Sequence, residues 1–415
     1  MKEESGQGDF LINQPFLFIL SIPRSFMHKS RIILTLLLAC FCTAAIHAAG
    51  SDGLNRPGVK SILKWLQAYL DSSAVDGIDQ RYIEVPKKPW QIVVRSNINQ
   101  SDLRMRSYIN AEAYTNSEQG KIQWEPRIRT DVTTYAGAWV GYRGFGIGMA
   151  KNVGGDKGNL FTLAATSSKY SLNLRIHHFQ TDNPVVHMEG YITDENGTDE
   201  YNNTEHFLLF EPIKVKTVMF DGVYFFNSKK FSNLAAYDQS TIQRRSAGSP
   251  ILGAMMFYSK VSYDEPLNND LIFFMNNIGR IKQWQASIGG GYAYNWVIGK
   301  NFMVNATVMP MVSFYNRLKI YTYDSYLYQL AIIDSDDYDD DVMINYDKWW
   351  IKPLGKKTVK GRVKLNYDAR LSLTYNLKDW FFNVNGQFSN FRYKHASSSG
   401  RLNDWYVNAS VGLRL

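Results

Sequence analysis

The stretch RVKLNYDARLSLTYNL, residues 362–377, decides the fold class of this chain. Apolar and polar side chains alternate along its whole length, which is the period of a β-strand and not of a helix. It is also much longer than the ~5–6 residues typical of strands in globular proteins. A long strand with one apolar and one polar face suits a transmembrane barrel, apolar toward lipid and polar toward the lumen.

The same alternation recurs along the chain, for example at 283–296, 302–314 and 380–389. Twelve candidate strands follow from it: 90–99, 103–115, 128–142, 145–153, 160–182, 214–228, 248–263, 283–298, 302–321, 362–377, 380–393 and 404–415. The sequence therefore predicts an all-β fold, a transmembrane antiparallel up-and-down β-barrel of about twelve strands. Counts of ten or fourteen strands remain alternatives.

The composition agrees with a barrel and excludes several other classes. Aromatic residues make up 14% of the 415 residues, and tryptophans fall at strand ends, where barrels carry interfacial girdles. No stretch after residue 50 approaches the ~18 apolar residues of a membrane helix. Both cysteines, Cys40 and Cys42, lie near the N-terminus, so the rest of the chain is neither a disulfide scaffold nor a thiol enzyme.

The lengths of the connections predict the orientation of the barrel. Short turns fall at 299–301 and 377–379, whereas long insertions fall at 183–213, 264–282 and 322–361. Bacterial outer-membrane barrels have short periplasmic turns and long extracellular loops. We therefore expect an integral protein in the outer membrane of a Gram-negative bacterium, with the long insertions outside.

The N-terminal part predicts processing and a short helix. Residues 27–48 have the basic start, apolar run and small residues of a signal peptide, with cleavage near Ala48 or, alternatively, lipidation at Cys40. Residues 1–26 then precede the true start, and 49–88 form a periplasmic segment before a barrel at 89–415. Within that segment Val59, Ile62, Leu63, Leu66 and Leu70 have the spacing of an amphipathic helix.

The polar faces of the strands predict a basic lumen. If the apolar faces meet lipid, the lumen receives three acidic residues, Glu112, Asp131 and Asp368, against a larger basic set. That set is Arg95, Arg104, Arg106, Arg175, Arg362, Lys364, Arg370 and Arg414. Such side chains either select or bind an anionic solute or form a packed salt-bridge network that fills a narrow barrel.

The connector at 229–249 is too long for a turn and carries Arg244 and Arg245. These arginines bind a periplasmic partner or lipid phosphate, or the segment folds into the lumen as a plug. A connector whose Ser and Thr side chains satisfy its own backbone is the simpler alternative.

An acidic run in the longest insertion offers weak metal ligands, Asp334, Asp336, Asp337 and Asp339. A solvated acidic loop is the usual explanation of such a run, and the run lacks the glycine and glutamate of an EF-hand. Neither His178 nor His395 belongs to a spaced nucleophile motif. We therefore expect no enzyme, no cofactor and no nucleic-acid partner.

Three segments carry a family resemblance: DQRYI at 79–83, the run from Tyr224 to Ser249 with QST and QRRSAGS at its end, and GGGYAYNW at 289–296. They resemble the Bacteroidetes outer-membrane family catalogued as domain of unknown function 4421. The resemblance covers about 79–415 and departs at Asn233-Leu234, where Tyr-Pro is expected. It implies an outer-membrane barrel with no established activity, so no catalytic residue is carried over.

The sequence thus favours passage or binding of a small, anionic solute through a porin-like barrel. The alternative is a barrel with a closed lumen that acts through its extracellular loops. Expected partners are outer-membrane lipid, lipopolysaccharide and the assembly machinery, which reads a final strand such as 404–415. Leu415 departs from the Phe that ends many such strands.

Overall fold

The computed structural model describes the barrel and its connector. Described are residues 67–68, 70–72, 76–110, 119–155, 157–182, 184–194, 197–206, 209, 211–265, 268, 271–272, 275, 277–323, 353–395 and 398–415. The predicted signal peptide, most of the predicted N-terminal helix and the acidic run of 334–339 lie outside these residues. Residues 67–68 and 70–72 are helical. Within the described residues no helix is long and apolar enough to cross a membrane.

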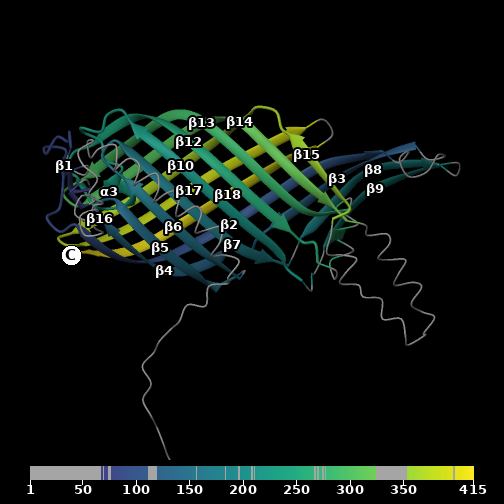
Figure 1. Ribbon diagram of the computed structural model, residues 1–415, viewed down its shortest axis with the longest axis horizontal. Coiled ribbons are helices and arrows are strands. Elements are labelled where there is room, and N and C mark those ends of the chain that lie inside the picture. The colour runs from purple at the N-terminus through teal and green to yellow at the C-terminus, as the bar shows by residue number, and fades with distance from the viewer. Residues whose placement is uncertain are drawn as a thin grey trace, which may run out of the picture. The chain divides into compact units, whose positions relative to one another are not determined.

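Twelve antiparallel strands close into a barrel (Figure 1). They are β2 (Trp90–Asn110), β4 (Thr133–Tyr142), β5 (Phe145–Gly154), β6 (Gly158–Thr166), β7 (Tyr170–Thr181), β10 (Ile213–Phe225), β12 (Ala247–Ser262), β13 (Ile278–Ile298), β14 (Phe302–Thr322), β16 (Lys364–Leu377), β17 (Trp380–His395) and β18 (Ser398–Arg414). The last strand pairs with the first, from Arg414 opposite Gln91 to Ser398 opposite Ser107. The predicted fold class and strand count are confirmed.

The alternation that predicted the barrel is the alternation of its two surfaces. On β16, Leu365 and Leu371 are exposed on the outer wall, while Asp368 and Ser372 are buried inside. The other strands follow the same rule, and large apolar side chains stay exposed all round the wall. A soluble protein would bury such a surface, because a large contiguous apolar patch in water is unfavourable.

Two predictions of strand boundaries were wrong, but together they leave the predicted number of strands unchanged. The segment 90–99 and the described part of 103–115, up to residue 110, are one strand, β2, because Ser101 stays in the ladder and its hydroxyl donates a hydrogen bond to Asp404 Oδ1 (2.6 Å). The segment 160–182 is two strands, β6 and β7, because Ser167 Oγ accepts hydrogen bonds from the backbone of Lys169 and Tyr170 and closes a turn. The predicted 128–142 is also broken, between β3 (Gln119–Arg129) and β4.

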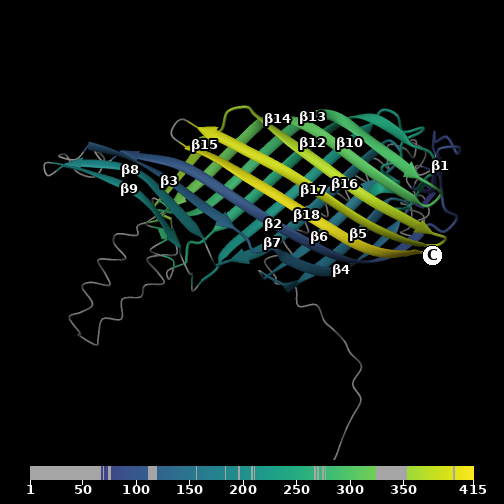
Figure 2. The ribbon, with the colours of Figure 1, turned by 180° about the vertical axis from the view of Figure 1, so that it is seen from behind.

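The two ends of the barrel differ, as Figures 1 and 2 show. One end, called the terminal end here, carries the C-terminus and tight turns such as Arg143–Gly144 and Lys378–Asp379. At the opposite, far end, β3 pairs with β8 (Val185–Asp194), which pairs with β9 (Gly197–His206). The insertion 183–213, predicted as a loop, therefore contains a hairpin, and β15 (Gly355–Lys360) lengthens the wall beside β14.

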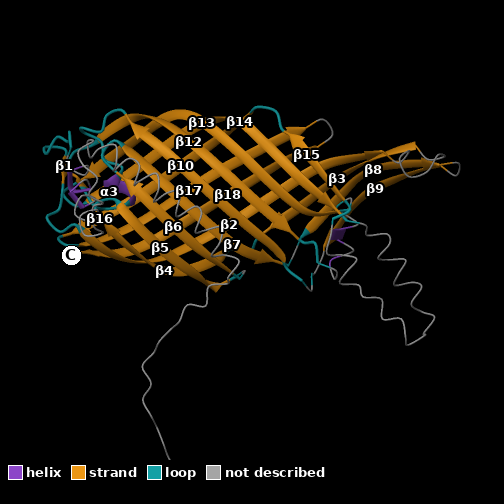
Figure 3. Cartoon of the chain, viewed as in Figure 1, coloured by secondary structure: helices purple, strands orange, loops and turns teal. Residues whose placement is uncertain are grey.

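The connector between β10 and β12 lies at the terminal end (Figure 3). It contains the short helix α3 (Leu234–Tyr237) and the strand β11 (Ile242–Gln243). The strand β11 pairs with β1 (Ile83–Glu84), which precedes the barrel. Residues 231–243 are almost entirely buried, so this connector is packed inside protein and not spread over its surface.

Candidate functional site

The connector, residues 226–246, is hydrogen-bonded to the inner wall, and we call it the plug. The side-chain amide of Asn383 on β17 donates to the carbonyl of Ala236 (3.0 Å). The hydroxyl of Tyr237 donates to Asn305 Oδ1 on β14 (2.8 Å). Helix α3 is thus bonded to two strands, β14 and β17, on either side of β16 in the sheet. The segment is therefore packed into the barrel, where the sequence left a plug and a simple connector both open.

Arg414 holds the residues that directly follow helix α3. Its side chain is fully buried, and its Nε and Nη2 donate to the carbonyl of Gln239 (3.0 and 2.9 Å). Nη2 also donates to Asn376 Oδ1 (2.6 Å), and the guanidinium lies 4.9 Å from the ring centre of Phe381. The last strand of the barrel therefore clamps the plug through a residue that the sequence assigned to a solute path.

Apolar side chains fill the lumen beyond the plug. Phe257 on β12 stacks on Phe391 on β17, with ring centroids 4.2 Å apart, although the two strands are not neighbours in the sheet. The contact therefore crosses the barrel. We call this group of buried residues the lumen core; it contains Met219, Met255, Phe257, Met309, Met311, Phe391 and Leu402.

Inward-facing glycine makes room for this core. A Cβ atom at Gly253 would lie 2.5 Å from the sulfur of Met309 and 2.9 Å from its methyl group. The absence of a side chain lets the methionine lie flat against β12, and flexible thioethers fill irregular space well. The lumen is therefore packed like a protein interior at this level.

Two arginines of the lumen form ion pairs with buried carboxylates. Arg370 lies 3.0 Å from Asp221 on β10 and 2.7 Å from Asp368 on its own strand. Arg175 on β7 lies 3.1 Å from Asp404 on β18. All five side chains are largely buried, so these are internal ion pairs and not a water-filled charged ring.

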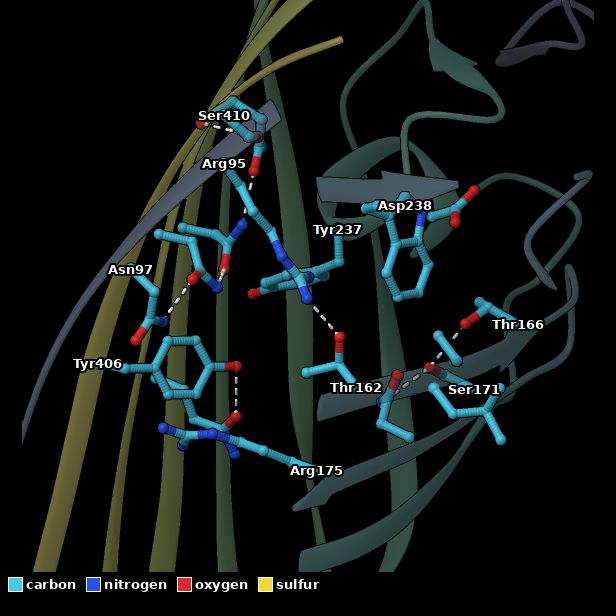
Figure 4. Close-up of a pocket in the computed structure, with 18 of the residues that line it drawn as sticks. Arg95, Asn97, Thr162, Thr166, Ser171, Arg175, Tyr237, Asp238, Tyr406 and Ser410 are labelled. Carbon is cyan, nitrogen blue, oxygen red and sulfur yellow. Dashed lines mark hydrogen bonds between the residues drawn. The ribbon is translucent and has the colours of Figure 1, made fainter. Parts of the chain in front are cut away.

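A cavity of about 160 Å³ remains between the plug and the wall. Arg95 on β2 reaches into it, and Figure 4 shows its guanidinium beside Tyr237 and Thr162. Arg95 Nη2 donates to Thr162 Oγ1 (2.5 Å), and the guanidinium lies 5.4 Å from the ring centre of Trp139. Among the described residues no carboxylate lies within ion-pair distance of Arg95, so its charge is uncompensated.

Two buried N–H groups at this cavity have no hydrogen-bond partner, Arg95 Nε and Arg175 Nη2. Arg175 lies over the ring of Tyr406 at 4.3 Å, which fixes the plane of its guanidinium. An unsatisfied buried donor costs about 1–3 kcal/mol, and more when it is charged.

Asp238 of the plug also lines the cavity. Its Oδ1 accepts a hydrogen bond from the backbone of Ser240 (3.2 Å), but its Oδ2 is buried without a partner. Burial raises the pKa of Asp238 to about 6, although its hydrogen bonds with Ser240 and the charge of Arg414 act in the opposite direction.

The predicted basic lumen requires correction. Arg95, Arg175, Lys364, Arg370 and Arg414 lie on the inner face. Arg104 and Arg106 do not, because inward positions on β2 are odd-numbered, and these two arginines bond to Asp102 and Glu125 on the outer face. Arg362 precedes β16 and is exposed, as is Asp131 in the break between β3 and β4.

Sequence reasoning missed the acidic partners Asp221 and Asp404, which face the lumen from β10 and β18. A count of eight basic against three acidic residues overstated the charge of the interior. Glu112 lies outside the described residues. The alternation along β10 could have identified Asp221, because this residue lies at an odd-numbered position, as do the buried, inward-facing Met219 and Val223.

The plug arginines have structural contacts. Arg244 Nε donates to Glu84 Oε2 (2.6 Å), and Arg244 Nη1 donates to the carbonyl of Lys300 (3.0 Å). Arg245 lies 5.8 Å from the ring centre of Tyr82. Arg244 thus ties the β1–β11 pair to the turn between β13 and β14. In the described part of the chain no group of three residues is placed to hold a metal ion.

Solved structures with similar architecture are outer-membrane barrels. The protease OmpT from Escherichia coli is 10% identical, with 80% of this chain and 98% of that chain covered and a TM-score of 0.27. The COG4313 outer-membrane channel from Pseudomonas putida F1 is 10% identical, with 80% and 97% covered and a TM-score of 0.27. The translocator domain of the autotransporter NalP from Neisseria meningitidis is 7% identical, with 85% and 96% covered and a TM-score of 0.26. Similarity at this level carries no argument about function.

No curated protein matches the chain significantly. A family model does match, over residues 77–414, and these residues include the barrel, the plug and the β1–β11 pair. The chain therefore belongs to the family described as Domain of unknown function (DUF4421).

Proposed function

We propose that this protein is an integral outer-membrane β-barrel that is closed at rest and binds a small anionic solute inside its lumen. The observation that carries the proposal is the buried cavity in which Arg95 has no counter-ion. The plug separates this cavity from the terminal end, and the lumen core lies beside it in the barrel interior.

The outer wall supports membrane insertion. Trp284 and Trp296 on β13 are both exposed, at 43% and 45%, and lie on the outer face toward opposite ends of the strand. The twelve positions from 284 to 296 span about 40 Å along a strand, or about 30 Å along the axis at an ordinary tilt. This agrees with an apolar band about 25 Å tall between two aromatic girdles. The short turns support a periplasmic position for the terminal end, because bacterial barrels have short periplasmic turns.

Packing within the lumen supports binding over free passage. An open porin keeps a polar, water-filled channel. Here Phe257 meets Phe391 across the barrel, and the plug is bonded to β14, β16, β17 and β18. A solute would have to displace both groups in order to cross.

The cavity favours a small anion. Its volume of about 160 Å³ lies below the ~300–1,000 Å³ of sites for drug-sized ligands. Arg95 and Arg175 line the cavity, and charge-assisted hydrogen bonds from a guanidinium to an oxyanion are among the strongest. Phosphate, sulfate and a small carboxylate have this chemistry.

Two measurements on the refolded mature barrel test the proposal. In a planar bilayer we expect no steady current, and an open, anion-selective current would overturn the closed resting state. In thermal unfolding we expect inorganic phosphate at constant ionic strength to raise the melting temperature, because a ligand of the folded form stabilises it.

Arg95→Gln should abolish the phosphate effect, whereas Arg362→Gln, at an exposed site outside the strands, should retain it. Equal stabilisation of both variants would mean that phosphate acts elsewhere, and the solute site would be withdrawn. Heat-modifiable migration in detergent gels checks that each variant is folded.

A second candidate function is contact with an external ligand through the far end. It is favoured by the β8–β9 hairpin, which projects beyond the barrel beside β3 (Figure 1). Replacing residues 185–206 by a tight turn should abolish adhesion of barrel-bearing liposomes to a glycan-coated surface while heat-modifiable migration persists. Unchanged adhesion would rule out the hairpin.

A further inference from the structure

Four lysines lie side by side on the outer wall near the far end. The strand registers place Lys216 on β10 opposite Lys260 on β12, Lys260 opposite Lys282 on β13, and Lys282 opposite Lys319 on β14. We call these four residues the lysine row. Each is a direct cross-strand neighbour of the next, which no separation along the sequence reveals.

The lysine row faces outward. Lys260 has the parity of Leu252 and Met256, which are exposed on the outer wall, and Lys282 has the parity of Trp284 and Ile288. One step nearer the middle of the barrel, Tyr258 packs against Trp284 with ring centroids 4.4 Å apart. The row therefore lies just beyond an aromatic girdle, where the lipid headgroups of one leaflet begin.

The row is electrostatically unfavourable as it stands. Like charges directly opposite each other on neighbouring strands destabilise a sheet. In the described part of the chain Lys260, Lys282 and Lys319 form no ion pair. Two carboxylates of the same end form ion pairs with other cations, Asp264 with Arg280 and Glu265 with Lys214.

Further cations widen the patch. Arg317 lies on the outer face of β14 opposite Lys360 of β15, and Tyr321 lies opposite Lys356. Lys282 Nζ lies 5.0 Å from the ring centre of Tyr321, so the ammonium group contacts an aromatic ring. Lys260 is within electrostatic range of three cations, Arg280, Lys282 and Lys216, and of one carboxylate, Asp264. In the described residues of this patch, positive charges therefore outnumber negative charges.

We propose that the lysine row binds the phosphate groups of a lipopolysaccharide-type lipid in the outer leaflet. The far end carries the long connections and is extracellular in the orientation proposed above, on which this inference rests. Lysine ammonium groups bind phosphate as point charges. The exposed wall below the row, with Met256, Ile288 and Val312, offers an apolar surface for the acyl chains.

The test compares lipids that differ only in phosphate. The mature barrel is refolded into phosphatidylcholine vesicles, and binding of diphosphorylated lipid A is measured beside a dephosphorylated form. Each basic residue near a lipid surface is worth about 1 kcal/mol, or about fivefold in affinity. The variant K260Q/K282Q/K319Q should therefore bind diphosphorylated lipid A about a hundredfold more weakly.

A matched control removes the same charge at the other end. K229Q/K300Q/K378Q neutralises three lysines of the terminal end and should leave lipid A affinity within about twofold of wild type. Equal loss in both variants would mean general charge attraction, and equal binding of the dephosphorylated lipid would mean contact through acyl chains alone. Either result overturns the proposal.

In a third outcome, the lysine row pairs with carboxylates of the same chain and not with lipid. The acidic run 334–341 lies between β14 and β15 in sequence. If wild type binds no lipid A, and if Asp336→Asn and Asp337→Asn weaken folding only while the lysines are present, the row pairs with this run and the proposal is wrong. Heat-modifiable migration in phosphatidylcholine alone separates all these outcomes from failure to form a barrel.

Discussion

Replacing Arg370 by glutamine tests whether the charged lumen is structural. The side chain of Arg370 is 12% exposed, and its partners Asp221 and Asp368 are 4% and 1% exposed. Arg370→Gln leaves two carboxylates without a cation in a closed interior. Breaking a buried ion pair from one side costs about 3–5 kcal/mol.

We expect the lower part of that range, about 3 kcal/mol. Asp368 keeps a hydrogen bond from Gln387 (2.6 Å), and Asp221 keeps one from Asn173 (3.0 Å). A loss of this size changes the unfolding equilibrium more than a hundredfold. Combining Arg370→Gln with Asp221→Asn and Asp368→Asn should restore most of the stability, because no buried charge then lacks a partner.

Urea unfolding in lipid vesicles, followed by tryptophan fluorescence and heat-modifiable migration, measures these differences. Arg362→Gln serves as the control and should stay within about 0.5 kcal/mol of wild type, since its side chain is exposed. A loss below about 1 kcal/mol for Arg370→Gln, or no recovery in the triple variant, would refute the structural reading. The lumen arginine would then be free to serve a passing anion.

Three further variants test the plug and the lumen core. The pKa of Asp238 is raised in the folded state, from 3.8 to about 6, so the free energy of unfolding is greatest below pH 4 and falls as the pH rises to 6. Asp238→Asn should therefore raise the free energy of unfolding by up to about 3 kcal/mol at pH 8 and leave it unchanged at pH 3.5, as measured by urea titration. Phe257→Ala removes the stack on Phe391 and should cost about 3–5 kcal/mol; an unchanged urea midpoint would show that the lumen is not packed there. Tyr237→Phe should cost about 1 kcal/mol by the same assay, because Asn305 Oδ1 still accepts a hydrogen bond from Thr307, and a loss above 3 kcal/mol would show that this hydroxyl does more than hold α3.

The outer wall could be predicted from sequence because lipid imposes one rule on every strand. Residues such as Leu365, Leu371 and Val384 must be apolar if they face acyl chains, so the period of two is visible wherever the inward face is polar. The strand count followed from that pattern. The ends of the strands could not be predicted from it. Ser101 continues a strand, whereas Ser167, a residue of the same type, closes a turn.

The interior could not be read in the same way. Met255 and Phe257 face the lumen while Leu252 and Met256 face outward, so β12 is apolar on both faces and shows no alternation. The plug depends on contacts such as Asn383 with Ala236, between residues 147 positions apart. The lysine row depends on strand register. These features arise from pairing between distant segments, which a local pattern does not contain.

The position of the plug in the chain couples its seating to closure of the barrel. The seam of the barrel joins β2 to β18, and the side chains of Asn97 and Asn408, which bond across it, are 311 positions apart. Contacts so distant in sequence are slow to form. The plug lies between β10 and β12 and contacts β14, β16, β17 and β18 from within. A closed seam would leave the mouth at the terminal end as the plug's way in, whereas an open sheet admits the plug from the side as well. The clamp of Arg414 on Gln239 joins the plug to the strand that completes the ring, so seating of the plug and closure of the seam stabilise each other.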